Sequence, residues 1–218
     1  MHLIILQFVH SKNFIGELSL NRMATMTESQ YLILLRGINV GGNNIIKMVD
    51  LKACFESMGF TDVITYIQSG NVVFRSAEND KAKLTTKIES VLSATFSYKS
   101  RVVTVTHKEL KKVVEDAPKG FGKEPDKYRY DVIFLKEPLT VKEAMKDVRV
   151  REGVDNAYAG KIVLYFSRFI SRASQSYLTK IIALPMYQNV TIRNWNTTTK
   201  LLALMEAGDE KSKSKKDK

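Results

Sequence analysis

Two short polar loops, each following a run of apolar residues, carry the residue types that could bind a ligand. The first belongs to LLRGINVGGNN at residues 34–44, and the second to TYIQSGNVVF at residues 65–74. Arginine, amide side chains and the free backbone N–H groups of glycines are typical donors to an anion or another polar ligand. The candidate ligand-binding residues are Arg36, Gly37, Asn39, Gly41, Gly42, Gln68, Ser69 and Asn71, with Arg193 of VTIRNW as a further candidate.

The glycines of the first loop do not form a known phosphate motif. They are spaced G-x-x-x-G-G and no G-K-[ST] follows, so neither a dinucleotide fingerprint nor a P-loop is present. The loop also has a purely structural interpretation, in which its glycines adopt positive φ and its asparagines bond their own backbone. Both interpretations stay open from the sequence.

The two arginines are the most informative candidates. Arg36 ends an apolar strand, where a guanidinium is costly to bury without a carboxylate, loop carbonyls or a ligand anion as partner, and an internal partner is favoured. Arg193 precedes a segment in which Asn194 or Asn196 can serve as a helix N-cap and Trp195 as an apolar anchor. Capping and packing explain that cluster, and a place for Arg193 in the same or a related cleft is the alternative.

Residue types that carry acid-base or metal chemistry are scarce. Of the three histidines, His2 and His10 lie near the start of the chain, and only His107 lies in a region of regular pattern. No Cys/His cluster and no persuasive Ser-His-Asp set can be assembled, so we expect no metal site and no cofactor. The pattern favours binding over demanding acid-base chemistry and leaves open whether the chain is an enzyme.

The elements that must position the loops begin at Tyr31. Apolar residues recur at strand or helix spacing, and Ser69-Gly70 is a hairpin signal. Thr106 and Glu109 form a capping box at the start of a further helix. Strands are predicted at 31–38, 62–68, 71–76 and 100–106, and helices at 48–58 and 80–96. This β-α-β-β-α-β order is that of a ferredoxin-like unit.

A similar order follows in the second half of the chain. Strands are predicted at 128–135 and 189–194, with a hairpin over 155–166 and helices near 140–146, 177–183 and 196–207. We therefore predict an α+β fold of two ferredoxin-like subdomains, each followed by an extra helix. The predicted divisions are a poorly ordered N-terminal extension (1–29), a first subdomain (30–117), a connector (118–127), a second subdomain (128–207) and a disordered lysine-rich tail (208–218).

Topology predicts that the two polar loops lie together. In a split βαβ unit the first two strands run the same way, and the third lies antiparallel between them. The end of the first strand and the hairpin turn then lie at the same edge of the sheet. Side chains from the two loops can converge there on a ligand, or they can tie the loops to each other.

Three strings, LLRGINVGG, TYIQSGNVVF and VTIRNW, resemble the recurrent motifs of a bacterial family of unknown function, DUF1697. The resemblance extends from about Tyr31 to Ala207. It implies an α+β protein with a two-part ferredoxin-like architecture. It assigns no catalytic residue, because no activity of the family is known.

Composition narrows the remaining possibilities. The net charge of +11 raises the question of a polyanionic partner, but the basic residues are spread along the chain. A single cysteine, Cys54, fits a reducing cytoplasm, and the apolar run near the start is shorter than a membrane span, so no membrane association is expected.

Two hypotheses about function follow. The first is a small anionic or nucleotide-like ligand bound by the loops 36–44 and 68–71. The alternative is an RNA- or protein-binding module that uses a sheet face and the basic surface, although no RNP-like motif is present. The oligomeric state is left open.

Overall fold

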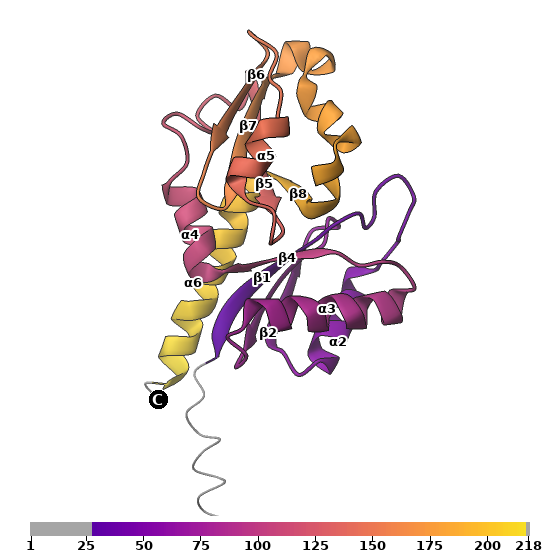
Figure 1. Ribbon diagram of the computed structural model, residues 1–218. Helices are drawn as coiled ribbons and strands as arrows, with labels where there is room; N and C mark the ends of the chain where they lie inside the picture. The colour runs from indigo at the N-terminus through magenta and orange to yellow at the C-terminus, as the bar shows by residue number, and fades with distance from the viewer. Residues whose placement is uncertain (1–27, 217–218) are drawn as a thin grey trace, which may run out of the picture.

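Residues 28–216 are described by the computed structural model, and they form two α+β subdomains that lie one above the other in Figure 1. The predicted N-terminal extension falls outside the described residues up to residue 27. Strand β1 begins at Ser29, next to the predicted boundary. Each subdomain contains one four-stranded sheet.

The first subdomain has the strand order β2-β3-β1-β4, and its neighbouring strands are all antiparallel. This is the ferredoxin-like order, because each helical connection passes over one strand position. Its elements are β1 (Ser29–Leu35), α2 (Met48–Ser57), β2 (Thr61–Tyr66), β3 (Asn71–Ser76), α3 (Lys81–Phe96), β4 (Val102–Thr106) and α4 (His107–Glu115).

The second subdomain repeats this topology with the strand order β6-β7-β5-β8. Three short 3-10 helices replace its second α-helix, so the helix predicted at residues 177–183 is the 3-10 helix η2. Its elements are β5 (Tyr128–Leu135), α5 (Val141–Asp147), β6 (Asp155–Ala159), β7 (Val163–Phe169), η1 (Ile170–Gln175), η2 (Tyr177–Ala183), η3 (Pro185–Asn189), β8 (Val190–Asn194) and α6 (Trp195–Lys216). The predicted fold class, two ferredoxin-like subdomains each followed by a helix, is confirmed.

Side-chain caps set the starts of the helices around β4. The hydroxyl of Thr106 accepts from the N–H of Glu109, and the Glu109 carboxylate accepts from the N–H of Thr106, which confirms the predicted capping box. Asp80 caps α3 by accepting from the N–H groups of Ala82 and Lys83. These bonds fix where α3 and α4 begin, on either side of β4 in the sequence.

Buried apolar side chains form three clusters. The first lies between the first sheet and helices α2 and α3, and another lies beneath α5 and η2 of the second subdomain. The cluster between them joins the subdomains, because one face of each sheet contributes to it together with α4 and α6. Its fully buried members include Leu32, Leu34, Val132, Val163 and Leu201. Each sheet is therefore covered on both faces, and the two subdomains share a core.

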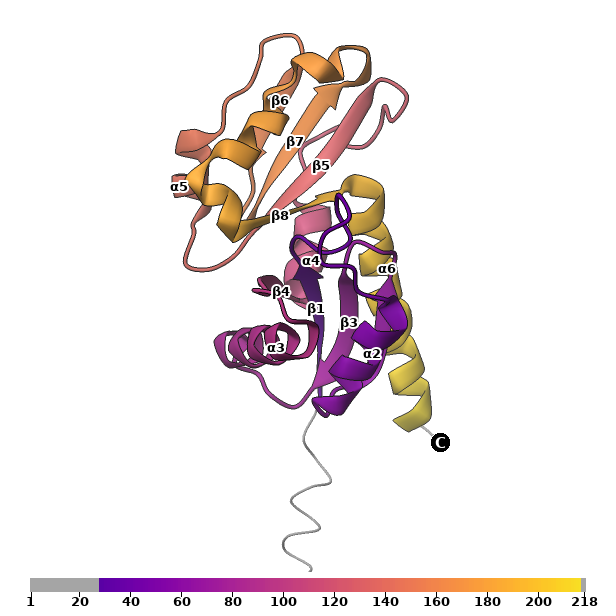
Figure 2. The same cartoon turned by 90° about the vertical axis from the view of Figure 1, so that its right-hand side faces the viewer.

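Helix α6 follows the last strand of the second subdomain and returns along the first (Figure 2). The Asp209 carboxylate accepts a hydrogen bond from Arg75, and its Oδ2 lies 2.7 Å from Nδ1 of His107. The structure thus differs from the predicted boundary at residue 207, since α6 continues to Lys216. The contacts of Asp209 with the first subdomain, together with the helix-favouring Glu210 and lysines, account for the extra turns.

Candidate functional site

The end of β1 and the turn between β2 and β3 meet at one edge of the first sheet. Leu34 pairs with Asn71, and the N–H of Leu35 donates to the carbonyl of Gly70 over 2.8 Å. The loop 36–46 and the turn 67–70 are therefore neighbours. The predicted convergence of the two polar loops is confirmed.

Arg193 reaches this edge from β8 of the second subdomain. The residue is only 7% exposed, and each of its three guanidinium nitrogens donates hydrogen bonds. Burial lowers its pKa to about 10, so the guanidinium remains protonated at neutral pH. The acceptors are Oδ1 of Asn71, Oγ1 of Thr191 and the carbonyls of Leu35, Ser69, Gly70 and Ile192, at 2.5 to 3.3 Å. We call this set of bonds the Arg193 clasp.

Asn71 is fully buried, and both ends of its amide are bonded within the chain. Its Oδ1 accepts from Nε of Arg193, while its Nδ2 donates to the carbonyl of Tyr66 over 2.8 Å and to Oγ of Ser69 over 3.0 Å. Together with the carbonyls of Ser69 and Gly70, Asn71 thus ties the hairpin turn to Arg193 in β8 of the other subdomain.

The Asn71 contacts lead to a prediction about stability. Asn71→Ala should lower the free energy of unfolding by about 1 to 3 kcal/mol, because Nε of the buried Arg193 loses its acceptor and the Tyr66 carbonyl loses a donor. Urea denaturation followed by circular dichroism measures the change. The matched control is Gln68→Ala in the same turn, an exposed residue whose loss should change stability by less than about 0.5 kcal/mol. Equal stabilities of the two variants would contradict the clasp.

The first loop is held by its own asparagines. Nδ2 of Asn39 donates to the carbonyls of Ile46 and Gln68 over 3.0 and 2.8 Å, and its Oδ1 accepts from the N–H of Ile46. Nδ2 of Asn44 donates to the carbonyl of Gly37 over 2.8 Å. The structural interpretation therefore fits this loop, whose tip at Gly41 and Gly42 is exposed.

Gly70 is required by close packing as well as by its backbone. Its φ is +72°, and an added Cβ would lie 2.7 Å from both Cδ1 of Ile38 and Cβ of Leu35. A side chain at this position would push the turn away from β1. The turn can approach β1, and present its carbonyls to Arg193, only with glycine here.

Arg36 is oriented differently from the other candidates, because it faces an open cleft. Its Nε donates to the carbonyl of Tyr187 in η3 over 3.0 Å, and its guanidinium lies 4.5 Å from the centre of the Tyr187 ring. The favoured internal partner is thus a loop carbonyl and an aromatic face. Among the described residues, no hydrogen bond occupies its two terminal amino groups.

The cleft beside Arg36 has a volume of about 760 Å³ and lies between the subdomains. Lys99 and Arg101, which immediately precede β4, line it on the same side as Arg36. Residues 182–188 of η2 and η3 form the opposite wall, with Ile182 and Pro185 exposed to it. We call this the Arg36 cleft.

The electrostatics of the Arg36 cleft are one-sided. Its lining contains three basic side chains and no acidic one. Arg101 donates to Oδ1 of Asn189 over 3.0 Å, which is a neutral acceptor. Within residues 28–216, none of the three cations forms an ion pair. Like charges gathered without counter-charges favour an anion in the space between them.

Lys99 and Arg101 were missed in the sequence analysis, although a signal for them exists. In a ferredoxin-like sheet β4 lies antiparallel to β1, so the start of β4 lies beside the end of β1. The N–H of Arg36 indeed donates to the carbonyl of Arg101 over 3.0 Å. Basic residues just before the fourth strand therefore belong to the same sheet edge as Arg36.

The fold and this cleft define an α+β protein of two ferredoxin-like subdomains with a basic cleft between them. The family described as "Protein of unknown function (DUF1697)" matches residues 28–165, and the chain belongs to that family.

Among solved structures, the chain is similar to SP0830, a conserved bacterial protein from Streptococcus pneumoniae. The two are 25% identical with a TM-score of 0.73, and the match covers 83% of this chain and 99% of that one. No curated protein matches the chain. The similarity agrees with the shared fold, and neither name states an activity.

Proposed function

We propose that the protein binds a small anionic ligand, nucleotide-like in having an apolar or aromatic part, in the Arg36 cleft. The observation that carries the proposal is the gathering of Arg36, Lys99 and Arg101 around one open space whose lining holds no carboxylate. The site is thus centred on Arg36 of the predicted set. We do not place Asn39, Asn71 or Arg193 in contact with the ligand, because their side chains are hydrogen-bonded within the chain.

The arginines of the cleft are held in place before any ligand arrives. Stacking on Tyr187 and the bond to its carbonyl orient Arg36, and the bond to Asn189 orients Arg101. A guanidinium fixed in this way loses little rotamer freedom on binding, which favours affinity. The exposed apolar side chains of the opposite wall suit a base or another apolar group of the ligand.

The proposal is one of binding, and we assign no reaction. The residues that line the cleft include no His, Cys, Asp or Glu that could move a proton. Among residues 28–216, no group of three His, Cys, Asp or Glu side chains is placed to hold a metal ion.

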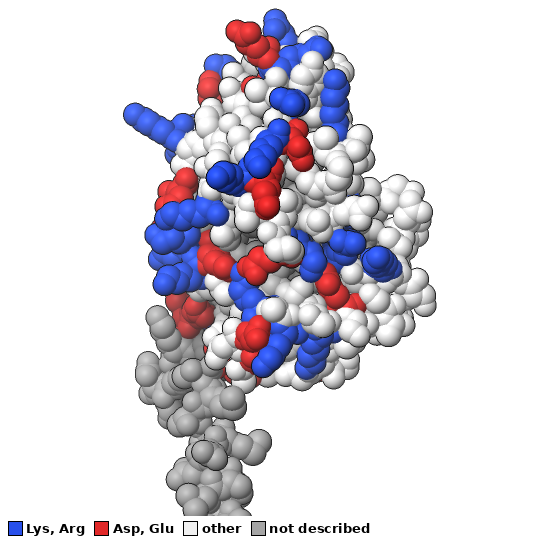
Figure 3. Space-filling view, viewed as in Figure 1, with Lys and Arg blue, Asp and Glu red and all other residues white. Residues whose placement is uncertain are grey.

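The alternative, an RNA or protein partner on a sheet face, finds less support. Both faces of each sheet are covered, so the surface that RNA-recognition domains of this topology use is buried. Figure 3 shows acidic and basic side chains interspersed over one face of the molecule. A nucleic-acid-binding face would instead carry a continuous basic patch. Salt-sensitive binding of generic RNA that ignores Lys99 would favour this alternative.

We also propose a bacterial cytoplasm as the setting. The family resemblance suggests the source, and the one cysteine, Cys54, is buried and unpaired, as is usual in a reducing compartment. Within the described residues no helix has the length and apolar character that spanning a membrane requires.

A thermal-shift screen with nucleotides, phosphorylated metabolites and carboxylates tests the proposed function. A ligand at a hundred times its dissociation constant adds about 2.7 kcal/mol of stability, which such a screen detects readily. The strongest hit is then titrated against variants by calorimetry. No shift across the whole panel would contradict the proposal.

Lys99→Gln should weaken the strongest hit about tenfold, because it removes one of the three cations that would contact the anion. The side chain of Lys99 is exposed, so folding stability should stay unchanged. The matched control is Lys119→Gln in the connector, which removes the same charge from an exposed site outside the cleft. Equal affinities of the two variants for the ligand would show that it does not bind in the Arg36 cleft.

A further inference from the structure

The first sheet has a free edge at β4. This strand pairs with β1 on one side, and no described strand pairs with its other side. The backbone of Arg101 faces β1, because its carbonyl accepts from the N–H of Arg36. In an antiparallel pair the backbone groups of alternate residues face the partner strand, so the N–H and C=O groups of Val102 and Thr104 point away from β1. The N–H of Val102 donates to Glu89 Oε1 over 2.8 Å, which agrees with this direction. The donor and acceptor of Thr104 are left for an added strand.

This edge lies in a second cleft between the subdomains, with a volume of about 390 Å³. Four consecutive residues of β4, 102–105, form one wall. The segment 134–141, which leads from β5 into α5, forms the other. A cleft that follows a strand edge in this way suits an extended chain. Between it and the Arg36 cleft, beside Arg101 and Lys136, the space is too narrow for a water molecule, so the two clefts are separate.

Three lysines line this cleft and can donate hydrogen bonds to an occupant. The lining includes Lys81, Lys136 and Lys161, with Glu137 as its single carboxylate. Each lysine already has an acidic partner: Lys81 with Glu109 and Glu137, Lys136 with Glu89, and Lys161 with Asp116, at 2.7 to 3.3 Å. An ammonium group has three donors, so each can also bond an incoming carboxylate.

We propose that the free edge of β4 binds an extended acidic peptide, which adds a fifth strand to the first sheet. Main-chain bonds to Thr104 would hold the peptide in register, and its acidic side chains would meet the lysines of the cleft. A peptide fits better than a simple anion, because the edge offers an acceptor as well as a donor. The proposal does not depend on the Arg36 cleft or on its ligand.

The test uses the full chain and a fluorescein-labelled peptide of about seven residues, the length of a typical strand, with alternating Glu and Val. Fluorescence anisotropy should show saturable binding. A peptide with Lys in place of Glu should bind at least about tenfold more weakly, and so should the acidic peptide N-methylated on alternate residues of either register, which removes its main-chain donors. No binding of the acidic peptide, or equal binding of its N-methylated forms, would overturn the proposal.

Two variants locate the bound peptide. Thr104→Pro removes the outward donor without touching the bonds to β1, and it should weaken binding at least about tenfold. Thr104→Val is the matched control, because it removes only the hydroxyl, which lies 2.6 Å from that of Thr85, and it should bind as the unchanged protein does. If the proline variant does not keep its melting temperature, the N-methylated peptides decide the question.

Other occupants of the edge give different results. A concentration-dependent dimer that Thr104→Pro dissociates would assign the edge to a second copy of this chain and overturn the peptide proposal. Displacement of the labelled peptide by free glutamate or inorganic phosphate at equal concentration would reduce the site to a simple anion site, with the same consequence.

Discussion

Replacing Arg193 with Ala is expected to lower the free energy of unfolding by about 3 to 5 kcal/mol, because the variant removes every hydrogen bond of the buried guanidinium. Its bonds to the carbonyls of Leu35 and Gly70 and to Oδ1 of Asn71 are buried, and these three acceptors would lose their shared donor. The clasp also joins residues more than 120 positions apart in the sequence, so its loss loosens the contact between the subdomains. Urea denaturation of the full chain measures the change.

Arg193→Lys separates the effect of charge from that of geometry. A lysine keeps the positive charge but lacks the planar fork that reaches several acceptors at once, so it should recover only part of the lost stability. Arg36→Ala is the second control, since Arg36 makes one carbonyl bond from a half-buried position and should cost no more than about 1.5 kcal/mol. A loss below about 1 kcal/mol for Arg193→Ala would show that water replaces the guanidinium and that the clasp contributes little.

The clasp illustrates what the sequence could not predict. The pattern around Arg193 is local, and it was explained by the N-cap and packing of the next helix. Asn194 does cap α6, since its Oδ1 accepts from the N–H of Thr197 over 2.7 Å. The partners of Arg193 itself lie in the other subdomain, and strand and helix periodicity do not show how two subdomains pack together.

The fold was predictable because local signals and topology agree. Apolar runs of strand length, a hairpin at Gly70 and the capping box at Thr106 all point to the same ferredoxin-like order. The segment 170–189 was less predictable, because short 3-10 helices share the composition of a short α-helix and lack its periodicity. The continuation of α6 past residue 207 rests on Asp209, whose partners Arg75 and His107 are distant in the sequence.

The candidate site was predictable only in part. Topology places the two polar loops at one edge, and that edge is observed. The second subdomain decides which of these side chains remain available to a ligand. Its Arg193 hydrogen-bonds Asn71, and its η3 segment forms one wall of the cleft at Arg36. The ligand site that we propose therefore includes Lys99 and Arg101 in place of the turn at 68–71.

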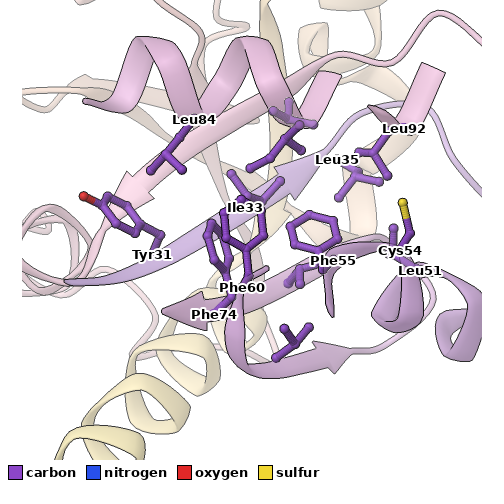
Figure 4. Close-up of a cluster of buried hydrophobic side chains, with 14 of the residues drawn as sticks. Tyr31, Ile33, Leu35, Leu51, Cys54, Phe55, Phe60, Phe74, Leu84 and Leu92 are labelled. Atoms are coloured by element: carbon purple, nitrogen blue, oxygen red, sulfur yellow. The ribbon is translucent and has the colours of Figure 1, made fainter. Parts of the chain in front are cut away.

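Phe55→Ala is expected to lower the free energy of unfolding by about 3 to 5 kcal/mol, through loss of buried area and the cavity left behind. Phe55 is fully buried, and its ring centre lies 5.5 Å from that of Phe74 and 5.9 Å from that of Phe60. Figure 4 shows these rings beside Ile33 in the core of the first subdomain. Since three aromatic rings and the first sheet meet there, the surroundings cannot close over the space without moving β3.

Val49→Ala on the same helix is the matched control for Phe55→Ala. Val49 is 69% exposed, so its truncation should change stability by less than about 0.5 kcal/mol. The comparison tests the buried face of α2, which Leu51, Cys54 and Phe55 form. Urea denaturation reports both variants, and a loss below about 1 kcal/mol for Phe55→Ala would mean that another face of α2 packs on the sheet.

Because the Phe55 core lies on the opposite face of the sheet from the core that joins the subdomains, the losses from Phe55→Ala and Arg193→Ala should add when the two changes are combined.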